Sequence, residues 1–426
     1  MKILFLTNLY PPNVFGGYER LCYEVATGLQ SRGHEVTVLT SSYGQYHGEA
    51  YGHTVRRELF LFANEENIYG PFDCSPAQRE EHEASNQRMF MDAIDTVKPH
   101  VLFVWNLYFF DNRLLSAIEK CSLPKMYLLT DNWMIVMLNS QFIKNRCTNT
   151  TLDRDQKHDD FKHKLHRLIK PISRLFDHDS IVLNGRAIFS SKFMRDYYRD
   201  AGFYFKRGEN ICYHGVRFLH VPGVKRVSRI ALEKTTIVRL LFAGRVVKTK
   251  GVHTAIEAVH EMRKRYCNLR IVLTIVGETQ DQEYCREIEL LIDSLGLREL
   301  ILFQPAVAES ELFNLFQNHD IYLFPSLYEP FSLTLIHALE SGIPTIASDV
   351  GGNIEMINNE KTGLIFRAGD YNDLADKINM LITKSSLRER LSQRAVAHAS
   401  KFTFNKMILR IETDLNKVVK LKLRLP

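Results

Sequence analysis

The sequence predicts an α/β protein of two domains, each built around a parallel, doubly wound sheet. Short apolar runs of strand length alternate with segments whose apolar residues recur at helical spacing through most of the chain. This alternation breaks in the polar and basic stretch 217–236 and then starts again. With 426 residues the chain is long enough for two such domains, each with its own core. We therefore predict a first domain over residues 1–220 and a second over 221–400.

The first domain is predicted to open on a strand, because Lys2–Thr7 is an apolar run. Apolar residues then recur at helical spacing from Tyr18 to Leu29, and Gly33 ends that helix. The further strands are expected at 35–40, 100–105, 125–130 and 187–190. Residues 139–179 interrupt this order, because they combine dense charge of both signs with apolar residues at helical spacing. This insertion is interpreted as a solvated amphipathic segment or as a lid that faces an acceptor or a membrane.

The second domain repeats the alternation with clearer periodicity. Its predicted strands are 237–243, 270–276, 300–303, 320–324 and 344–348. Its predicted helices are 252–265, 281–295, 309–317, 333–341 and 371–383. Strands that alternate with helices in this way form parallel sheets, since each helix carries the chain back to start the next strand in the same direction.

Composition is that of an ordinary globular protein, with 45% hydrophobic and 24% charged residues and a net charge of +6. No nucleic-acid module is evident, so no nucleic-acid partner is expected. The apolar N-terminal run is too short for a secretion signal, and Val101–Phe110 is about half of a membrane span and contains Asn106. The seven cysteines include no Cys-x-x-Cys pair. This pattern favours a cytoplasmic location and predicts no metal site.

Residues 325–344 carry the most specific pattern in the chain. A buried strand ends at Pro325, a short loop holds Glu329, and a helix begins directly afterwards, near Ser332. In open α/β sheets, ligands bind at the carboxyl ends of the strands. A helix N-terminus at that edge offers N–H groups and the positive end of its dipole to a phosphate or a sugar oxygen. Glu329 can accept hydrogen bonds from sugar hydroxyls beside it.

In this stretch the chain resembles the family 4 group of retaining glycosyltransferases with the GT-B fold, and the resemblance extends over nearly the whole chain. It implies two facing Rossmann-like domains with a cleft between them, and a C-terminal helix over 401–426 that packs back on the first domain. It also implies a nucleoside diphosphate-sugar donor. Glu329 matches the family glutamate that binds hydroxyls of the donor sugar. The backbone amides that hold the sugar and its phosphate in the family match those of Phe331, Ser332, Leu333 and Thr334.

The chain departs from the family pattern at residue 337. A second family glutamate, which holds the ribose hydroxyls of the donor, falls on His337. A neutral imidazole has one acceptor nitrogen, whereas a carboxylate can accept from both hydroxyls. We expect His337 to take over this contact in a weaker or differently shared form. The alternative is that the ring points into the helix packing and does not meet the nucleotide.

A second motif, Gly244–Gly251, follows the first strand of the second domain and opens a helix. It resembles the family's Gly-Arg, four residues, Lys-Gly signature, which implies that Arg245 and Lys250 clamp the donor diphosphate. Two cations would stabilise the negative charge on the departing nucleoside diphosphate without a metal ion. The alternative for both residues is a solvated surface charge, and Lys248 between them is interpreted as a surface residue.

The first domain carries two matching elements. Gly16 and Gly17, between the first strand and the first helix, resemble the family's Gly-Gly loop, which closes over the donor phosphate and lines the acceptor site. The alternative is a plain strand-to-helix turn, and the loop lacks the Gly-x-Gly-x-x-Gly dinucleotide fingerprint. Asp131 belongs to a stretch that aligns with a family His-Asp pair. Thr130 stands in place of that histidine and cannot carry a proton in the same way.

Two further positions are left open. Glu355 ends a stretch similar to the family's Gly-Gly-x-x-Glu element, and is interpreted either as a fold-stabilising carboxylate or as a ligand contact. His214 stands where the family usually has asparagine, and no chemistry is assigned to it.

Together these motifs predict a retaining, metal-independent transferase that moves a hexose-type sugar from a nucleoside diphosphate to an unidentified acceptor: a polysaccharide, a glycolipid or a small molecule. The predicted catalytic residues are Glu329, Arg245, Lys250 and Asp131. No cofactor is expected besides the sugar nucleotide itself. Two alternatives remain, a GT-B nucleotide-sugar epimerase and a degenerate, non-catalytic sugar-nucleotide binder. The departures at Thr130, His214 and His337 keep the second alternative open.

The tail 417–426 alternates cations with apolar residues and contains no acid. An anionic surface attracts such a segment by about 1 kcal/mol per nearby cation. We therefore expect peripheral attachment to the inner face of a membrane in part of the population, with a purely structural role of the last helix as the alternative.

Overall fold

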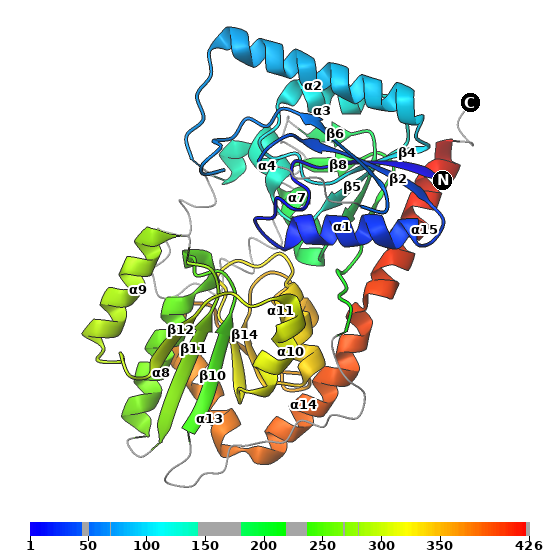
Figure 1. Ribbon diagram of the computed structural model, residues 1–426. Coiled ribbons are helices and arrows are strands. Elements are labelled where there is room, and N and C mark those ends of the chain that lie inside the picture. Colours follow the sequence, from blue (N-terminus) through cyan, green and yellow to red (C-terminus); the bar gives the residue numbers. More distant parts are fainter. Residues whose placement is uncertain are drawn as a thin grey trace. The chain divides into compact units, whose positions relative to one another are not determined.

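A computed structural model describes residues 1–44, 51–68, 70–143, 180–218, 237–266, 269–279 and 281–422. Two compact units are present, and each is described by itself (Figure 1). Unit 1 comprises Met1–Ser190, Met194–Cys212 and Ile408–Pro426, and unit 2 comprises Ser191–Phe193 and Tyr213–Met407. The insertion predicted over 139–179 and the boundary predicted near 220–236 lie almost entirely outside the described residues.

Unit 1 is built on a parallel sheet with the strand order β3-β2-β1-β4-β5-β7-β9, and β6 and β8 form a separate two-stranded parallel sheet. Its strands are β1 (Lys2–Leu6), β2 (Glu35–Ser41), β3 (Thr54–Leu59), β4 (Val101–Val104), β5 (Lys125–Leu129), β6 (Ile181–Leu183), β7 (Arg186–Phe189), β8 (Phe203–Phe205) and β9 (Glu209–Ile211). Its helices are α1 (Gly17–Gln30), α2 (Pro76–Val97), α3 (Asn112–Lys120) and α4 (Trp133–Leu138). Helix α7 (Lys192–Asp200) belongs to unit 1 from Met194 onward, and α15 (Phe404–Lys422) from Ile408 onward.

Unit 2 is built on a second parallel sheet with the strand order β12-β11-β10-β13-β14-β15. Its strands are β10 (Ile237–Ala243), β11 (Arg270–Val276), β12 (Ile301–Gln304), β13 (Ile321–Phe324), β14 (Thr345–Ser348) and β15 (Leu364–Phe366). Its helices are α8 (Val252–Arg265), α9 (Gln282–Ser294), α10 (Glu309–Gln317), α11 (Leu333–Ser341), α12 (Asn353–Met356), α13 (Tyr371–Thr383) and α14 (Ser385–Ala399), with short 3-10 turns at Lys248–Lys250 and Ser400–Phe402.

The central strand of unit 2 shows why both faces of this sheet are covered. Leu240 and Phe242 of β10 belong to the core beneath α8 and α13, whereas Leu241 and Ala243 belong to the core beneath α10 and α11. Because successive side chains of a strand point to opposite faces, an uninterrupted apolar strand requires a helical layer on each side. The predicted α/β class with doubly wound parallel sheets is confirmed by this arrangement and by the strand orders.

The C-terminal helix is fixed to unit 1 by a buried ion pair. The carboxylate of Asp414, which is fully buried, accepts from the Arg186 guanidinium at 3.0 Å and from the Asn210 amide at 2.6 Å. The carboxylate of Glu412 contacts Arg32 at 2.7 Å and His34 at 3.0 Å on the same unit. Within the described residues, none of the helices combines the length and apolarity needed to span a membrane.

Candidate functional site

The strand order of unit 2 reverses between β10 and β13. From β10 the chain proceeds to β11 and β12 on one side, and from β13 to β14 and β15 on the other. The loops at the carboxyl ends of these two strands therefore part, and such a switch point is where open α/β sheets bind ligands. Arg245 follows β10 and Glu329 follows β13, so the structure brings these two predicted residues to the same place in the sheet.

Glycines allow three loops to meet at this edge. The Leu327 amide donates to the Thr249 carbonyl at 2.8 Å, and the Gly352 amide donates to the Glu329 carbonyl at 2.9 Å. A Cβ on Gly251 would overlap the Pro325 carbonyl oxygen, and one on Gly351 would overlap that of Glu329. Both glycines also have positive φ, 66° and 55°. Any larger residue would push the loops apart, so these glycines determine how closely the charged side chains approach.

Lys250 and Glu329 form an ion pair at the switch point, with 2.5 Å between Lys250 Nζ and Glu329 Oε2. The Glu329 side chain is only 6% exposed and that of Lys250 20% exposed. Ser326 Oγ lies 3.4 Å from the same carboxylate oxygen. Burial of a charged pair costs desolvation energy that the attraction between the two charges only partly offsets. The pair therefore contributes little to the stability of the fold, but it holds both charged groups in fixed positions.

Helix α11 begins at Leu333, four residues after Glu329. The Ser332 hydroxyl caps it by accepting from the Leu335 amide at 3.1 Å. The Phe331 ring is buried and stacks on Tyr213, with centroids 5.6 Å apart, so Phe331 offers only its backbone to a ligand. A helix start leaves its first N–H groups without partners inside the helix, and at Leu333 and Thr334 these groups follow Glu329 by four and five residues.

The other two basic residues of the loop after β10 differ from Lys250. Arg245 is exposed, and within the described part of the chain its guanidinium has no ion-pair partner. Lys248 is 70% exposed and lies 3.5 Å from Glu287, as expected of a surface residue. Arg245 is therefore available to a ligand, whereas Lys248 is occupied at the surface.

His337 is buried between two carboxylates rather than exposed at the edge. Its Nε2 lies 3.0 Å from Glu309 of α10, and its Nδ1 lies 3.3 Å from Glu340 of α11. Burial by itself lowers the pKa of His337, but the hydrogen bonds from Glu309 and Glu340 outweigh it and raise the pKa to about 9. At neutral pH His337 is therefore an imidazolium whose ring nitrogens both donate.

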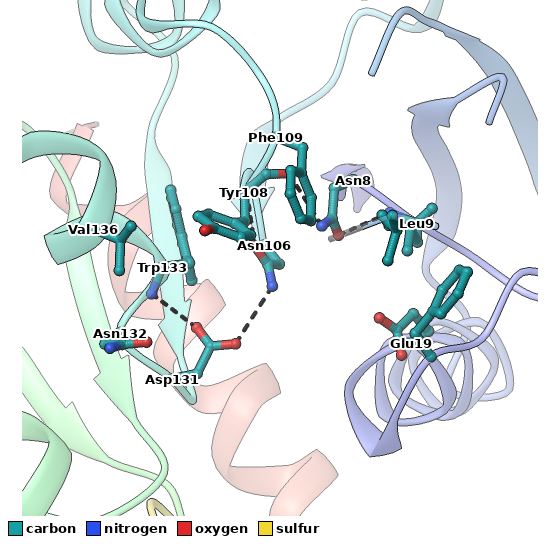
Figure 2. A pocket seen from close by; sticks show the side chains of 12 residues that line it. Asn8, Leu9, Glu19, Asn106, Tyr108, Phe109, Asp131, Asn132, Trp133 and Val136 are labelled. Carbon is teal, nitrogen blue, oxygen red and sulfur yellow. Dashed lines mark hydrogen bonds between the residues drawn. The ribbon is translucent and has the colours of Figure 1, made fainter. Parts of the chain in front are cut away.

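The sheet of unit 1 reverses its order between β1 and β4, and a pocket of about 240 Å³ lies at that edge. Asn8 follows β1, Asn106 follows β4 and Asp131 follows β5, so three successive strand ends supply polar groups (Figure 2). The other residues that line the pocket are Leu9, Phe15, Glu19, Ile68, Tyr108, Phe109, Asn132, Trp133 and Val136. A pocket of carboxamides, carboxylates and aromatic rings suits a neutral, hydroxyl-rich molecule better than an anion.

Asp131 is held in this wall by two neighbours. Its carboxylate accepts from the Trp133 amide at 3.1 Å and from the Asn106 amide group at 3.4 Å (Figure 2). Burial raises the pKa of Asp131 to about 6, while the Trp133 hydrogen bond opposes that shift and the charge of Glu19 adds to it. Thr130 beside it is buried. The carboxylate is thus ionised at neutral pH and only weakly stabilised, which suits a hydrogen-bond acceptor for a hydroxyl group.

The glycine loop of unit 1 is the start of α1. Gly16 has an extended backbone at the N-cap, and its amide donates to Glu19 Oε2 at 3.1 Å. Gly17 is the first helical residue. Glu19, which sequence reasoning did not single out, is 6% exposed and lines the pocket. Its place three residues after the N-cap is the capping-box spacing, which was the available signal.

Glu355 is occupied within the fold. Its carboxylate accepts from the amides of Lys192 and Phe193 at 2.9 Å and from the Tyr213 hydroxyl at 3.0 Å. It thus caps the first two residues of α7, which belong to unit 2 like Glu355 itself, and this favours the fold-stabilising interpretation of this residue. His214 is buried, which lowers its pKa to about 3, and its ring packs edge-on against Phe331. In the described part of the chain, no three His, Cys, Asp or Glu side chains are arranged to hold a metal ion.

Two family models match the chain. The model for "Glycosyl transferases group 1" matches residues 225–398, and that for "Glycosyltransferase Family 4" matches residues 15–209. Among curated proteins, the chain is similar to D-inositol 3-phosphate glycosyltransferases. It is 29% identical to the protein of that name from Paenarthrobacter aurescens, over 42% of this chain and 44% of the relative. For that of Thermobifida fusca the identity is 30% over 42% of each chain. The chain thus spans less than half the length of these relatives.

Solved structures resemble the whole chain. Sucrose-phosphate synthase from Thermosynechococcus elongatus has a TM-score of 0.71 at 18% identity over 99% of both chains. HepE from Anabaena, in complex with UDP and glucose, has a TM-score of 0.66 at 19% identity over 98% of this chain and 99% of the other. At these identities the likeness shows the fold, which is GT-B.

Proposed function

We propose that this chain, which belongs to the group 1 glycosyltransferases of the family 4 type, transfers a sugar from a nucleoside diphosphate donor to a hydroxylated acceptor. The observation that carries the proposal is the Lys250–Glu329 pair at the switch point of unit 2, beside the N-terminus of α11. A cation and free helix N–H groups suit a diphosphate, and an adjacent carboxylate suits sugar hydroxyls. The bound UDP and glucose of the HepE structure support this kind of donor.

The residues of unit 2 divide the chemistry between them. Lys250, Arg245 and the amides after Ser332 stabilise the negative charge that grows on the diphosphate as the glycosidic bond breaks. Glu329 holds the donor sugar by its hydroxyls, and its ion pair with Lys250 fixes both groups before the donor binds. Because these charges are supplied by the chain itself, we propose that transfer needs neither a metal ion nor a cofactor. Retention of the anomeric configuration is proposed from the family resemblance.

The pocket of unit 1 is proposed to hold the acceptor. Asp131 there accepts a hydrogen bond from the attacking hydroxyl, and Asn8 and Asn106 bind neighbouring hydroxyls. The D-inositol 3-phosphate glycosyltransferases among the relatives are named for a polyhydroxylated substrate, which supports a hydroxylated acceptor. Because that substrate carries a phosphate and this pocket suits a neutral molecule better than an anion, we propose a neutral acceptor for this chain. The role of Gly16 and Gly17 at the donor phosphate and the attachment of the basic tail to a membrane stay predictions. Lys417 and Lys420 of that tail are exposed, and residues 423–426 lie outside the described chain.

A donor panel tests the proposal. Thermal unfolding is recorded with UDP-, GDP- and ADP-sugars, each with and without EDTA. A ligand present at a hundred times its Kd stabilises the native state by about 2.7 kcal/mol, which is several degrees in Tm. One nucleotide class is expected to raise Tm, equally with EDTA. If no nucleotide sugar changes Tm, the proposed function is wrong; if EDTA abolishes the shift, the metal-free clamp is wrong. The comparisons support a transferase over an epimerase or a non-catalytic binder.

A further inference from the structure

We propose that Glu309 supplies the carboxylate that holds the ribose of the donor, and that the buried His337 side chain positions it. This inference rests on the proposed function, because it concerns the same nucleotide. His337 itself cannot make the contact in this structure. It is 3% exposed, and its two ring nitrogens lie 3.0 Å from Glu309 and 3.3 Å from Glu340. An imidazolium with both N–H groups engaged has no acceptor for a hydroxyl.

The two carboxylates around His337 are not equivalent. Glu340 has a side chain only 2% exposed, so it neutralises the imidazolium inside the protein. Glu309 has a side chain 36% exposed, and one of its oxygens contacts His337 while the side chain as a whole reaches solvent. A ligand in solvent can therefore reach Glu309 but not Glu340, and the contact with His337 holds Glu309 in place. The arrangement therefore presents a fixed carboxylate to the outside.

The position of Glu309 in the fold places that carboxylate at the ligand-binding edge of the sheet. Glu309 is the first residue of α10, which the loop 305–308 joins to the carboxyl end of β12. The N-terminus of α10 stabilises a negative charge there through its dipole. Its partner His337 lies five residues beyond the N-cap Ser332 of α11, which is about 7–8 Å along the helix axis. Under the proposed function, the phosphates of the donor bind at that N-cap and Glu329, on the preceding loop, holds the donor sugar. The ribose, at the other end of the diphosphate, is therefore expected along α11.

The chemistry of the ribose fits a carboxylate better than any other side chain. Its vicinal 2′- and 3′-hydroxyls are two adjacent donors, and the two oxygens of one carboxylate can accept from both. A carboxylate from α10 restores this capacity without a glutamate at position 337. His337 is then a positioning residue, which holds Glu309 in one rotamer and touches no part of the donor.

The test compares binding of two ligands by calorimetry. The first is whichever of UDP, GDP and ADP binds the wild type most tightly, and the second is its 2′,3′-dideoxy counterpart. For Glu309→Gln, which keeps the shape of the side chain, affinity for the ribonucleotide is expected to fall on the order of tenfold or more. Affinity for the dideoxynucleotide is expected to change less than twofold. The matched control is Glu311→Gln in the same helical turn, whose carboxylate caps the Ala308 amide at 3.1 Å. Both affinities should stay within about threefold in that control.

The positioning role of His337 is read from a double-mutant cycle with His337→Gln. In the His337→Gln background, Glu309→Gln should cost less affinity for the ribonucleotide than it does in the wild type, and the dideoxynucleotide should show no such difference. If His337 had a purely structural role, His337→Gln would change the affinity for both ligands alike. If His337→Gln does not fold, Glu309→Gln alone decides. If Glu309→Gln lowers the affinity for both ligands equally, or for neither, the inference is wrong, while the proposed donor site in unit 2 is not affected. If no nucleoside diphosphate binds the wild type, the proposed function fails instead.

Discussion

In unit 1, the strands at the switch point lead into Asn8 and Asn106, whereas in unit 2 the corresponding strands lead into Arg245 and Glu329. Both sheets are parallel and both reverse their strand order between two central strands. The edges nevertheless differ in charge: amides, aromatic rings and Asp131 in unit 1, and an ion pair with an exposed arginine in unit 2. The same topology thus builds two sites of different specificity, because the loops and not the strands carry the chemistry.

The largest expected effect tests the charge of the unit 2 edge. Lys250→Ala should lower turnover by about 100-fold or more, the loss expected when one preorganised charge contact to a transition state is removed. Lys248→Ala is the matched control, because Lys248 lies in the same 3-10 turn and is 70% exposed. Steady-state rates with the donor identified by the Tm panel measure both. Equal rates for the two variants would show that the edge does not bind the diphosphate.

A smaller effect concerns the His337 cluster. The pKa of His337 rises from 6.5 to about 9 in the folded protein, so its stabilising contribution is complete below pH 6.5 and is lost as pH rises through 9. His337→Gln should therefore lower the free energy of unfolding by about 2–3 kcal/mol at pH 6.5 and by clearly less at pH 9.5. Urea unfolding at the two pH values measures the difference. A loss that does not change with pH would mean that the ring is neutral.

The smallest expected effect concerns Asp131 in unit 1 and the pH dependence of stability that it causes. The pKa of Asp131 is raised from 3.8 to about 6, so the folded state loses stability as pH rises through this window. Asp131→Asn removes this titrating group. The free energy of unfolding of the variant, relative to that of the wild type, should therefore rise by about 1 kcal/mol between pH 4.5 and pH 7. This expected change is small because solvent in the pocket screens the charge of Asp131. Urea unfolding of both proteins is again the measurement, and parallel pH profiles would contradict a buried, ionised Asp131.

The strength of local periodicity explains which parts of the fold the sequence predicts. Helices 252–265, 309–317 and 333–341 were predicted with the bounds that the structure has, since each carries a regular apolar face between turn residues. Helix α2 was missed. It buries only Asn86, Phe90 and Ala93, so its 22 residues show little amphipathic pattern. Strand β3 was missed as well, because an edge strand of sequence TVRREL is too polar to stand out.

The sequence predicts the site residues that lie at the ends of strands, but not those that meet only through the packing of two helices. Arg245, Lys250 and Glu329 each end a predicted strand or start a predicted helix, so topology alone brings them to one edge. Glu309 and His337 lie on separate helices, and only the packing of α10 against α11 shows that they meet. Asn106 was noticed only as a polar interruption of an apolar run. Whether these side chains bind donor or acceptor stays a prediction.

The Asp414–Arg186 ion pair has a consequence for exchanging domains between related enzymes. The group 1 model ends at residue 398, ahead of the segment from Ile408 that belongs to unit 1. A chimera joined by order along the chain, with one foreign block from residue 225 to the end, would therefore import a foreign partner for Arg186, whose side chain is 14% exposed. Loss of one member of a buried pair costs about 3–5 kcal/mol, a large share of the stability of a typical domain. A working hybrid has to leave the last helical turns with their original N-terminal half, so recombination in this architecture needs two crossover points rather than one.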